Sequence, residues 1–503
     1  MLAPTAPAIE YDDEPDQGWS AYAPLEGPVW ALIAVGVLFA LLSANPLLTA
    51  ASLLTFPILI TLLWRRGEVP ILLFAAGYQW LQVSAKIFQA NLLGVEITVL
   101  GLTPTVERAT WMGLLAVLVL AIGMRLALRT VGTSRSNEAE DEARMIPFSR
   151  AFGFYLICAV IGAAANAAAW AVASLTQIAI GIEGIKWIGF YVFAYVALTQ
   201  RRGYLLLAGV TAFEFIQGIG FFSGFKTVVF VLVLAFFTAS RRIDGRSLGF
   251  GLAGLAGLLV IGSAWTVVKV DYRAFLNQGS QMQQTVVSEE EQVGKLIELV
   301  GGLSWDDVGR GFNPLLARVA YVDFFGATMD YVPAVVTYQE GVVWREALQN
   351  LIPRLFYPDK PVLSSDSEHT TQYTGIYVAS DGEGTSISLG YVADSYIDFG
   401  PVGMYVPILM IGFLWGLMYR YFMRRSGSAL LGFGFALSAL LVAYQYEIAA
   451  VKLVAGVVVK FLVLAVVLRF FETRIREWLG ISEADLAEAE WEDASDDLEP
   501  DYA

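Results

Sequence analysis

The sequence is nearly without cysteine and histidine. Among its 503 residues, Cys158 is the only cysteine and His369 is the only histidine. A disulfide needs two cysteines, and structural zinc sites are built from four Cys and His ligands. We therefore expect no internal disulfide, no zinc site and no Cys-His pair of neighbouring catalytic groups.

Basic residues are missing from both ends of the chain. Residues 1 to 27 hold six carboxylates, residues 481 to 503 hold ten, and neither segment contains Lys or Arg. Without these sixteen carboxylates the formal charge of -15 becomes +1, so the acidity belongs to two tails. We expect solvated acidic tails, with docking of a cytoplasmic partner as the alternative. A cleaved signal peptide is not expected, because no basic segment precedes the first apolar run.

Nucleotide-binding motifs are missing as well. No P-loop, dinucleotide fingerprint or nucleotide-sugar site occurs on the short polar loops. We therefore predict no cofactor and no metal, and no nucleic-acid partner is expected.

Long apolar runs are the main feature of the sequence. The chain is 56% hydrophobic with a mean hydropathy of +0.59, and its runs match the roughly 17 to 25 residues that cross a bilayer. They fall near 28–45, 46–64, 70–90, 109–128, 151–173, 180–199, 204–222, 224–240, 247–268, 401–422, 429–447 and 449–469. This pattern predicts an all-α polytopic membrane protein with about 12 transmembrane helices.

Arginine marks every second loop, for example Arg65/Arg66, Arg201/Arg202 and Arg424/Arg425. Such loops face the cytoplasm, which places both termini there and the long 269–395 loop outside. The predicted order is an acidic tail (1–27), spans 1–9 (28–268), the periplasmic loop (269–395), spans 10–12 (396–470) and a second acidic tail (471–503).

Several predicted spans carry polar side chains. Gln79, Gln82, Lys86 and Gln89 recur at helical spacing in the third span, so they share a face that must point into the bundle. Lys86, Lys226 and Lys452 lie near outer span ends, where an anionic headgroup or a loop carboxylate would explain them.

The long loop shows four local patterns. Asn313-Pro314 predicts the start of a helix that runs to about Val332 and carries Arg318 and Asp323. A short helix is predicted from about 343 to 350, a rigid strap from Pro353 to Pro361, and a flexible stretch over 364–383. The strap would present Arg354 and Lys360 from a fixed backbone.

Three segments resemble one protein family. Ile352-Pro-Arg-Leu-Phe-Tyr-Pro-Asp-Lys-Pro361 resembles a signature of bacterial O-antigen and exopolysaccharide repeat-unit polymerases of the Wzy type. Asp394-Ser-Tyr-Ile-Asp-Phe-Gly400 is similar to their motif before the next span. Ser223-Gly-Phe-Lys226 resembles an inter-span turn of theirs, with Lys in place of Arg.

The resemblance implies a metal-independent glycosyltransferase of the bacterial inner membrane. It would polymerise undecaprenyl-pyrophosphate-linked repeat units at the periplasmic face, beside a chain-length-regulating co-polymerase and a flippase. Arg354 and Arg318, with Lys360, Lys226, Lys86 and Lys452, would hold pyrophosphate. Asp394 or His369 would act as the base, and Tyr396 and Asp323 would contact substrate. An O-antigen ligase and a lipid-linked glycan flippase remain alternatives.

Overall fold

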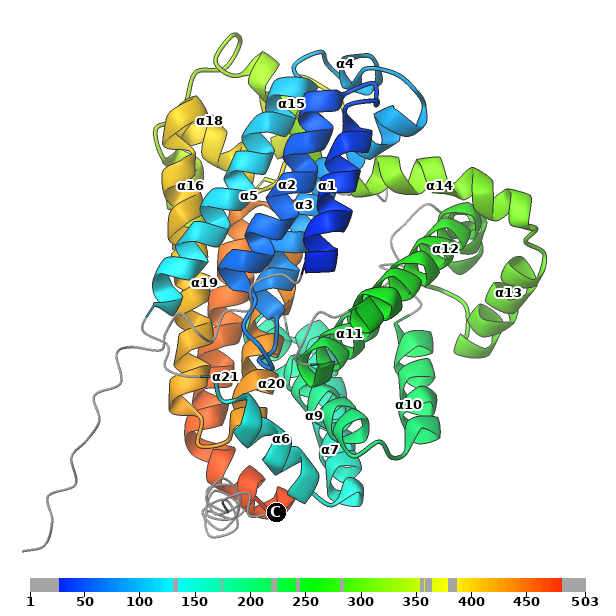
Figure 1. The fold of residues 1–503 in the computed structure, drawn as a ribbon, viewed down its shortest axis with the longest axis vertical. Coiled ribbons are helices and arrows are strands. Elements are labelled where there is room, and N and C mark those ends of the chain that lie inside the picture. The colour runs from blue at the N-terminus through cyan, green and yellow to red at the C-terminus, as the bar shows by residue number, and fades with distance from the viewer. Residues whose placement is uncertain are drawn as a thin grey trace, which may run out of the picture.

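A computed structural model describes residues 27–129, 134–172, 175–218, 224–240, 245–280, 285–352, 357, 364–378 and 387–481. Every regular element in these ranges is a helix (Figure 1). All twelve apolar runs of the sequence coincide with helices: α1(Gly27–Ala40), α2(Pro46–Leu63), α3(Ile71–Leu92), α5(Val106–Leu128), α7(Phe148–Ala171), α8(Thr176–Glu183) with α9(Ile185–Thr199), α10(Tyr204–Gln217), α11(Lys226–Ser240), α12(Gly245–Leu276), α19(Tyr405–Arg425), α20(Ala429–Leu440) with η4(Leu441–Tyr444), and α21(Ala450–Leu479).

Six segments of the described chain are long and apolar enough to cross a membrane. They are Pro46–Leu63, Val106–Leu128, Phe148–Ala169, Thr176–Thr199, Tyr405–Arg425 and Ala450–Leu479. The all-α membrane character is therefore confirmed, whereas twelve crossings and the side on which each loop lies stay predictions.

Helices α5 and α19 pack with their backbones in close contact and run in the same direction (Figure 1). Gly123 faces the backbone of Leu409 and Gly412, while Gly412 faces the backbone of Leu120. Small residues at such a crossing let two backbones approach without a side chain between them. This pair fixes where the segment before α19 enters the bundle.

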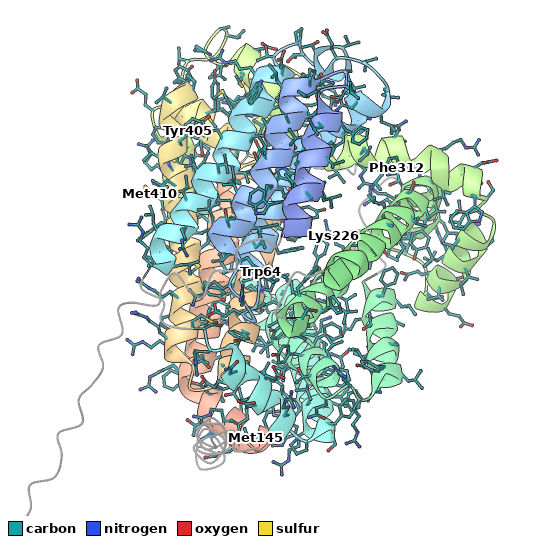
Figure 2. The ribbon with its side chains drawn as sticks, in the orientation of Figure 1. Trp64, Met145, Lys226, Phe312, Tyr405 and Met410 are labelled. Atoms are coloured by element: carbon teal, nitrogen blue, oxygen red, sulfur yellow. The ribbon has the colours of Figure 1, made fainter. Side chains whose placement is uncertain are left out.

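Helix α12, with α13(Glu289–Gly301) and α14(Trp305–Val319), extends to one side of the bundle (Figure 1). Gly311 of α14 packs on Ser263 of α12. The side-chain amide of Gln89 in α3 donates a hydrogen bond to the backbone carbonyl of Asn313. Helix α14 thus bridges α12 and the bundle. Figure 2 shows Phe312 on this helix and Met410 at the opposite edge of the molecule.

The helix predicted from Asn313 to Val332 is instead two helices. Helix α14 begins eight residues earlier, at Trp305, because Ser304 and Asp307 form a capping box. Pro314 lies inside it. The chain breaks near Tyr321, whose amide donates to the carbonyl of Gln82 in α3 rather than continuing the helix, and α15(Val322–Tyr331) follows.

The remaining loop prediction is partly right. Helix α16(Val342–Gln349) matches the predicted 343–350 helix within one residue. The stretch predicted to be flexible contains α17(Asp366–Thr374), which starts at a Ser365/Glu368 capping box. The spacing of Ser365 and Glu368 follows the known capping-box pattern, so this helix start was predictable from the sequence.

Two further helices lie between spans. The four-residue α4(Ile97–Leu100) joins α3 to α5, and α6(Ser136–Met145) packs on α20. Glu142 of α6 accepts hydrogen bonds from the Ser428 hydroxyl (2.8 Å) and the Leu430 amide (2.8 Å). It therefore caps the first turn of α20 with a buried carboxylate.

Candidate active site

Helices α17 and α18(Tyr391–Gly403) bring the single histidine against a buried aspartate. His369 Nε2 lies 2.9 Å from Asp394 Oδ1. The Asp394 side chain is 1% exposed, whereas that of His369 is 18% exposed. We call these two residues the dyad. The loop end of the bundle, where α15 to α18 pack, holds it.

The second oxygen of Asp394 is also engaged. Oδ2 accepts a hydrogen bond of 2.7 Å from the Ala450 amide in the first turn of α21. A carboxylate is favoured there, because the free amides of a helix N-terminus carry partial positive charge. Asp394 is thereby fixed between the first turn of α21 and the His369 ring.

This geometry determines which ring nitrogen of His369 can accept a proton. A carboxylate only accepts hydrogen bonds, so Nε2 carries hydrogen when it binds Asp394. In the neutral ring Nδ1 then keeps its lone pair, and it has no hydrogen-bond partner among the described residues. Tyr373 packs edge-on at 4.8 Å between ring centroids.

The pKa of His369 is raised above its ordinary value. Burial of the ring acts to lower this pKa, but the hydrogen bond and charge of Asp394 outweigh it, and Asp366 adds to them. A carboxylate that orients an imidazole and raises its basicity is the arrangement of a general base.

The segment from Tyr444 to Ala450 connects the dyad to polar side chains of α3. The Gln82 amide group donates to Glu447, and its oxygen accepts from the Tyr446 amide at 2.9 Å. Gln79, Gln82, Lys86 and Gln89 are all buried, which confirms the polar inward face predicted for the third span.

Two of the predicted pyrophosphate-binding lysines are paired with carboxylates. Lys86 Nζ lies 2.6 Å from Asp323 Oδ2, and Lys452 Nζ lies 2.6 Å from Asp366 Oδ2. The Lys86 pair is mostly buried, whereas Lys452 is 57% exposed. Asp366 begins α17, so the Lys452 pair lies beside the dyad. A phosphate here would have to compete with a carboxylate.

Two other predicted cations have no such partner in the described chain. Lys226, at the start of α11, has its Nζ 5.6 Å from the centroid of the Tyr444 ring. Figure 2 shows Lys226 in the middle of the molecule in this view, between the bundle and α12. Tyr444 is six residues before Ala450, whose amide binds Asp394, so Lys226 contacts the chain segment that leads to the dyad.

Arg318, on the last turn of α14, also has no ion pair among the described residues. It lies near Lys269 and Arg273 of α12. Burial of the Lys269 ammonium and the charges of Arg318 and Arg273 lower the pKa of Lys269 to about 7. Neighbouring positive charges disfavour one another's charged form. The sequence does not predict that Lys269 and Arg318 lie close together, because 49 residues separate them.

The remaining predicted residues divide into two groups. Tyr396 is buried among Phe325 and Tyr338, and its hydroxyl donates to the Val332 carbonyl at 3.3 Å. Two positions from Asp394 on the same helix, it faces away from the dyad. Arg354 and Lys360 lie outside the described residues, so their roles stay predictions.

Asp398 caps the start of α16. Its oxygens accept from the amides of Val343 (3.1 Å) and Trp344 (2.8 Å), which begin α16. Asp394 and Asp398, one helical turn apart on α18, therefore each cap a different helix. The sequence motif that contains both serves to position α16 and α21 around the dyad.

Residues 115–475 match the family model described as a domain of unknown function (DUF8712). The match covers more than half of the chain, which therefore belongs to this family. No curated protein and no solved structure matches the chain.

Proposed function

We propose that this chain is an integral-membrane glycosyltransferase that polymerises undecaprenyl-pyrophosphate-linked repeat units at the outer face of the bacterial inner membrane. The observation that carries the proposal is the dyad. A buried carboxylate orients the His369 ring and leaves Nδ1 with a lone pair at the loop end of a helical membrane bundle. The sequence resemblance supplies the reaction class.

The reaction assigns a role to each group. His369 Nδ1 accepts the proton of a sugar hydroxyl on the acceptor while the hydroxyl oxygen bonds to the anomeric carbon of the donor. The bond between that carbon and the pyrophosphate oxygen breaks, and pyrophosphate leaves with the electron pair. Cations stabilise the developing negative charge, and Lys226 and Arg318 are two of the predicted pyrophosphate-binding residues that have no ion pair among the described residues.

The resemblance also places a chain-length-regulating co-polymerase and a flippase beside this enzyme. These partners, both cytoplasmic termini and the strap residues Arg354 and Lys360 belong to the proposal. The strap would bring Arg354 to the leaving pyrophosphate, where a planar guanidinium binds two phosphate oxygens at once.

The test is the pattern of lipid-linked glycans in a deletion strain that carries wild-type protein, His369→Ala or Gln372→Ala. His369→Ala should lower polymer formation by about 100- to 10,000-fold, the usual contribution of a general base, and single repeat units on lipid should accumulate. Gln372 is exposed on the same helix, so Gln372→Ala should leave polymer length and amount unchanged.

Three outcomes would overturn the proposal. Full-length chains that stay on lipid would indicate a ligase, and repeat units that stay inward-facing would indicate a flippase. Normal polymer with His369→Ala protein present in the membrane would remove the dyad from the chemistry.

A further inference from the structure

The Arg-rich ends of α19 and α21 enclose two adjacent cavities. One has a volume of about 570 Å³ and is lined by Tyr421, Arg425, Leu468, Arg469, Glu472 and Thr473. The other, of about 410 Å³, shares Tyr421 and Arg425 and is also lined by Leu414, Leu417, Met418, Phe461, Arg420 and Arg424. Together they form one groove, polar at one end and apolar at the other.

The polar end carries excess positive charge. Arg425 and Arg469 have no ion pair within the described part of the chain. Glu472, the one carboxylate in the lining, instead accepts from the Gly427 amide and the Ser426 hydroxyl, each at 2.6 Å, in the turn before α20. The guanidinium groups are therefore available to an anion from outside the chain.

The groove lies at the level expected for one surface of the membrane. Arg425 is 20 residues from the start of α19 and Arg469 is 19 residues from the start of α21. At 1.5 Å per residue these intervals span about 30 Å, close to the thickness of the hydrocarbon core. Phe461 and Tyr421, 5.3 Å apart between ring centroids, lie on the membrane side of the arginines.

We propose that this groove binds an anionic phospholipid, with the headgroup phosphate on Arg425 and Arg469 and an acyl chain along Leu414, Leu417 and Phe461. Guanidinium groups bind phosphate through paired hydrogen bonds, and basic pockets between membrane helices hold anionic headgroups. The general preference of one membrane side for Arg explains the number of cations here. It does not explain a concave site in which the cations adjoin an apolar channel.

The test uses the full-length protein in detergent, titrated with phosphatidylglycerol, phosphatidylcholine or inorganic phosphate, with bound molecules counted by native mass spectrometry. Phosphatidylglycerol should bind and the other two should not. The double variant Arg425→Gln/Arg469→Gln should bind it about 30-fold more weakly, since each basic residue near an anionic headgroup contributes about 5-fold. Arg474→Gln, an exposed position five residues further along α21, should bind as the wild type does.

A second double variant, Arg425→Lys/Arg469→Lys, keeps the charge and should lose only part of the affinity. Unchanged binding in the Gln variant would overturn the proposal. Equal binding of phosphatidylcholine would do so as well, and so would binding of inorganic phosphate without phosphatidylglycerol. Thermal unfolding of each variant is followed in parallel, and a Gln variant that unfolds like the wild type yet still binds fully would be decisive against it.

Discussion

Asp394 uses its two oxygens to hold two groups, the His369 ring and the first turn of α21. Because it is almost fully buried, loss of either partner would leave a charge poorly compensated, which costs several kcal/mol. The same constraint makes the residue suitable for orienting a base. Its effect on His369 can be measured separately from its effect on folding.

Asp394→Asn should shift the pH dependence of polymerisation. In the wild type the neutral form of His369 is the base, so activity should rise with pH through a pKa above the ordinary 6.5. Asn removes the charge that raises this pKa while burial, which lowers it, remains. The rising limb should therefore move to lower pH, and the maximal rate should fall because the ring is held less firmly. The measurement is the polymerisation rate in membrane vesicles from pH 5 to 9. If the rising limb of the pH–rate profile stays at the same pH, His369 is not the base whose pKa Asp394 raises.

Glu142 gives a second prediction for one residue. Burial raises the pKa of this carboxyl to about 7, against the opposing effect of its hydrogen bonds from Leu430 and Ser428. A carboxyl whose pKa is raised on folding stabilises the fold at pH values below its ordinary pKa, and this contribution is lost as pH rises through about 7.

Glu142→Gln removes that titration and can still accept hydrogen bonds at the start of α20. The loss of thermal stability between pH 6 and pH 8 should be smaller in Glu142→Gln than in the wild type. Glu140→Gln, in the same helix with a more exposed ion pair to Arg144, is the matched control and should follow the wild type. If thermal stability depends on pH in the same way in the wild type and in Glu142→Gln, the Glu142 carboxyl does not titrate between pH 6 and pH 8.

At the scale of elements, the α5–α19 pair depends on glycines that permit backbone contact. A Cβ at Gly412 would overlap the Leu120 carbonyl, whereas a Cβ at Gly209 of α10 would meet nothing within 4 Å. Gly412→Ala should therefore destabilise the protein by about 1–3 kcal/mol, as overpacking does. Gly209→Ala should be neutral or slightly stabilising, since Ala favours helix over Gly.

Unfolding midpoints in detergent, together with the amount of protein in the membrane, would measure this difference. Equal midpoints for Gly412→Ala and Gly209→Ala would mean that the α5–α19 pair can separate at little cost. Because α19 follows α18 directly, a shift of α19 should also move Asp394. Gly412→Ala should then lower activity per folded molecule.

At the scale of the whole molecule, some features of the sequence predict the fold and others do not. Apolar runs of bilayer length located every long helix, since lipid requires each spanning segment to satisfy its own backbone. The spacing of Gln79 and Gln82 alone predicted which face of α3 points into the bundle. The break at Tyr321 could not be predicted, because its cause is a carbonyl of α3, 239 residues earlier. Asp394 and His369 were both candidates, but their contact depends on how α17 packs against α18.

Topology is the prediction on which the whole molecule depends. Helix α12 has 32 residues and α21 has 30, about 48 and 45 Å at 1.5 Å per residue. Each exceeds the roughly 30 Å hydrocarbon core, so the two ends of each helix should reach opposite sides. Reporters fused after Arg246 and Ser280 should therefore act as cytoplasmic and external, respectively.

Cysteine labelling gives an independent measurement of the same topology, because the only native cysteine, Cys158, is buried. Ser280 and Glu477 are both exposed. In intact spheroplasts a membrane-impermeant maleimide should label Ser280→Cys at once, and it should label Glu477→Cys only after lysis. The arginines before α20 and in the last turns of α21 favour this orientation. Labelling of both positions in intact spheroplasts would place the loop and the C-terminal helix end on one side. The dyad could then not act on an externally presented glycan.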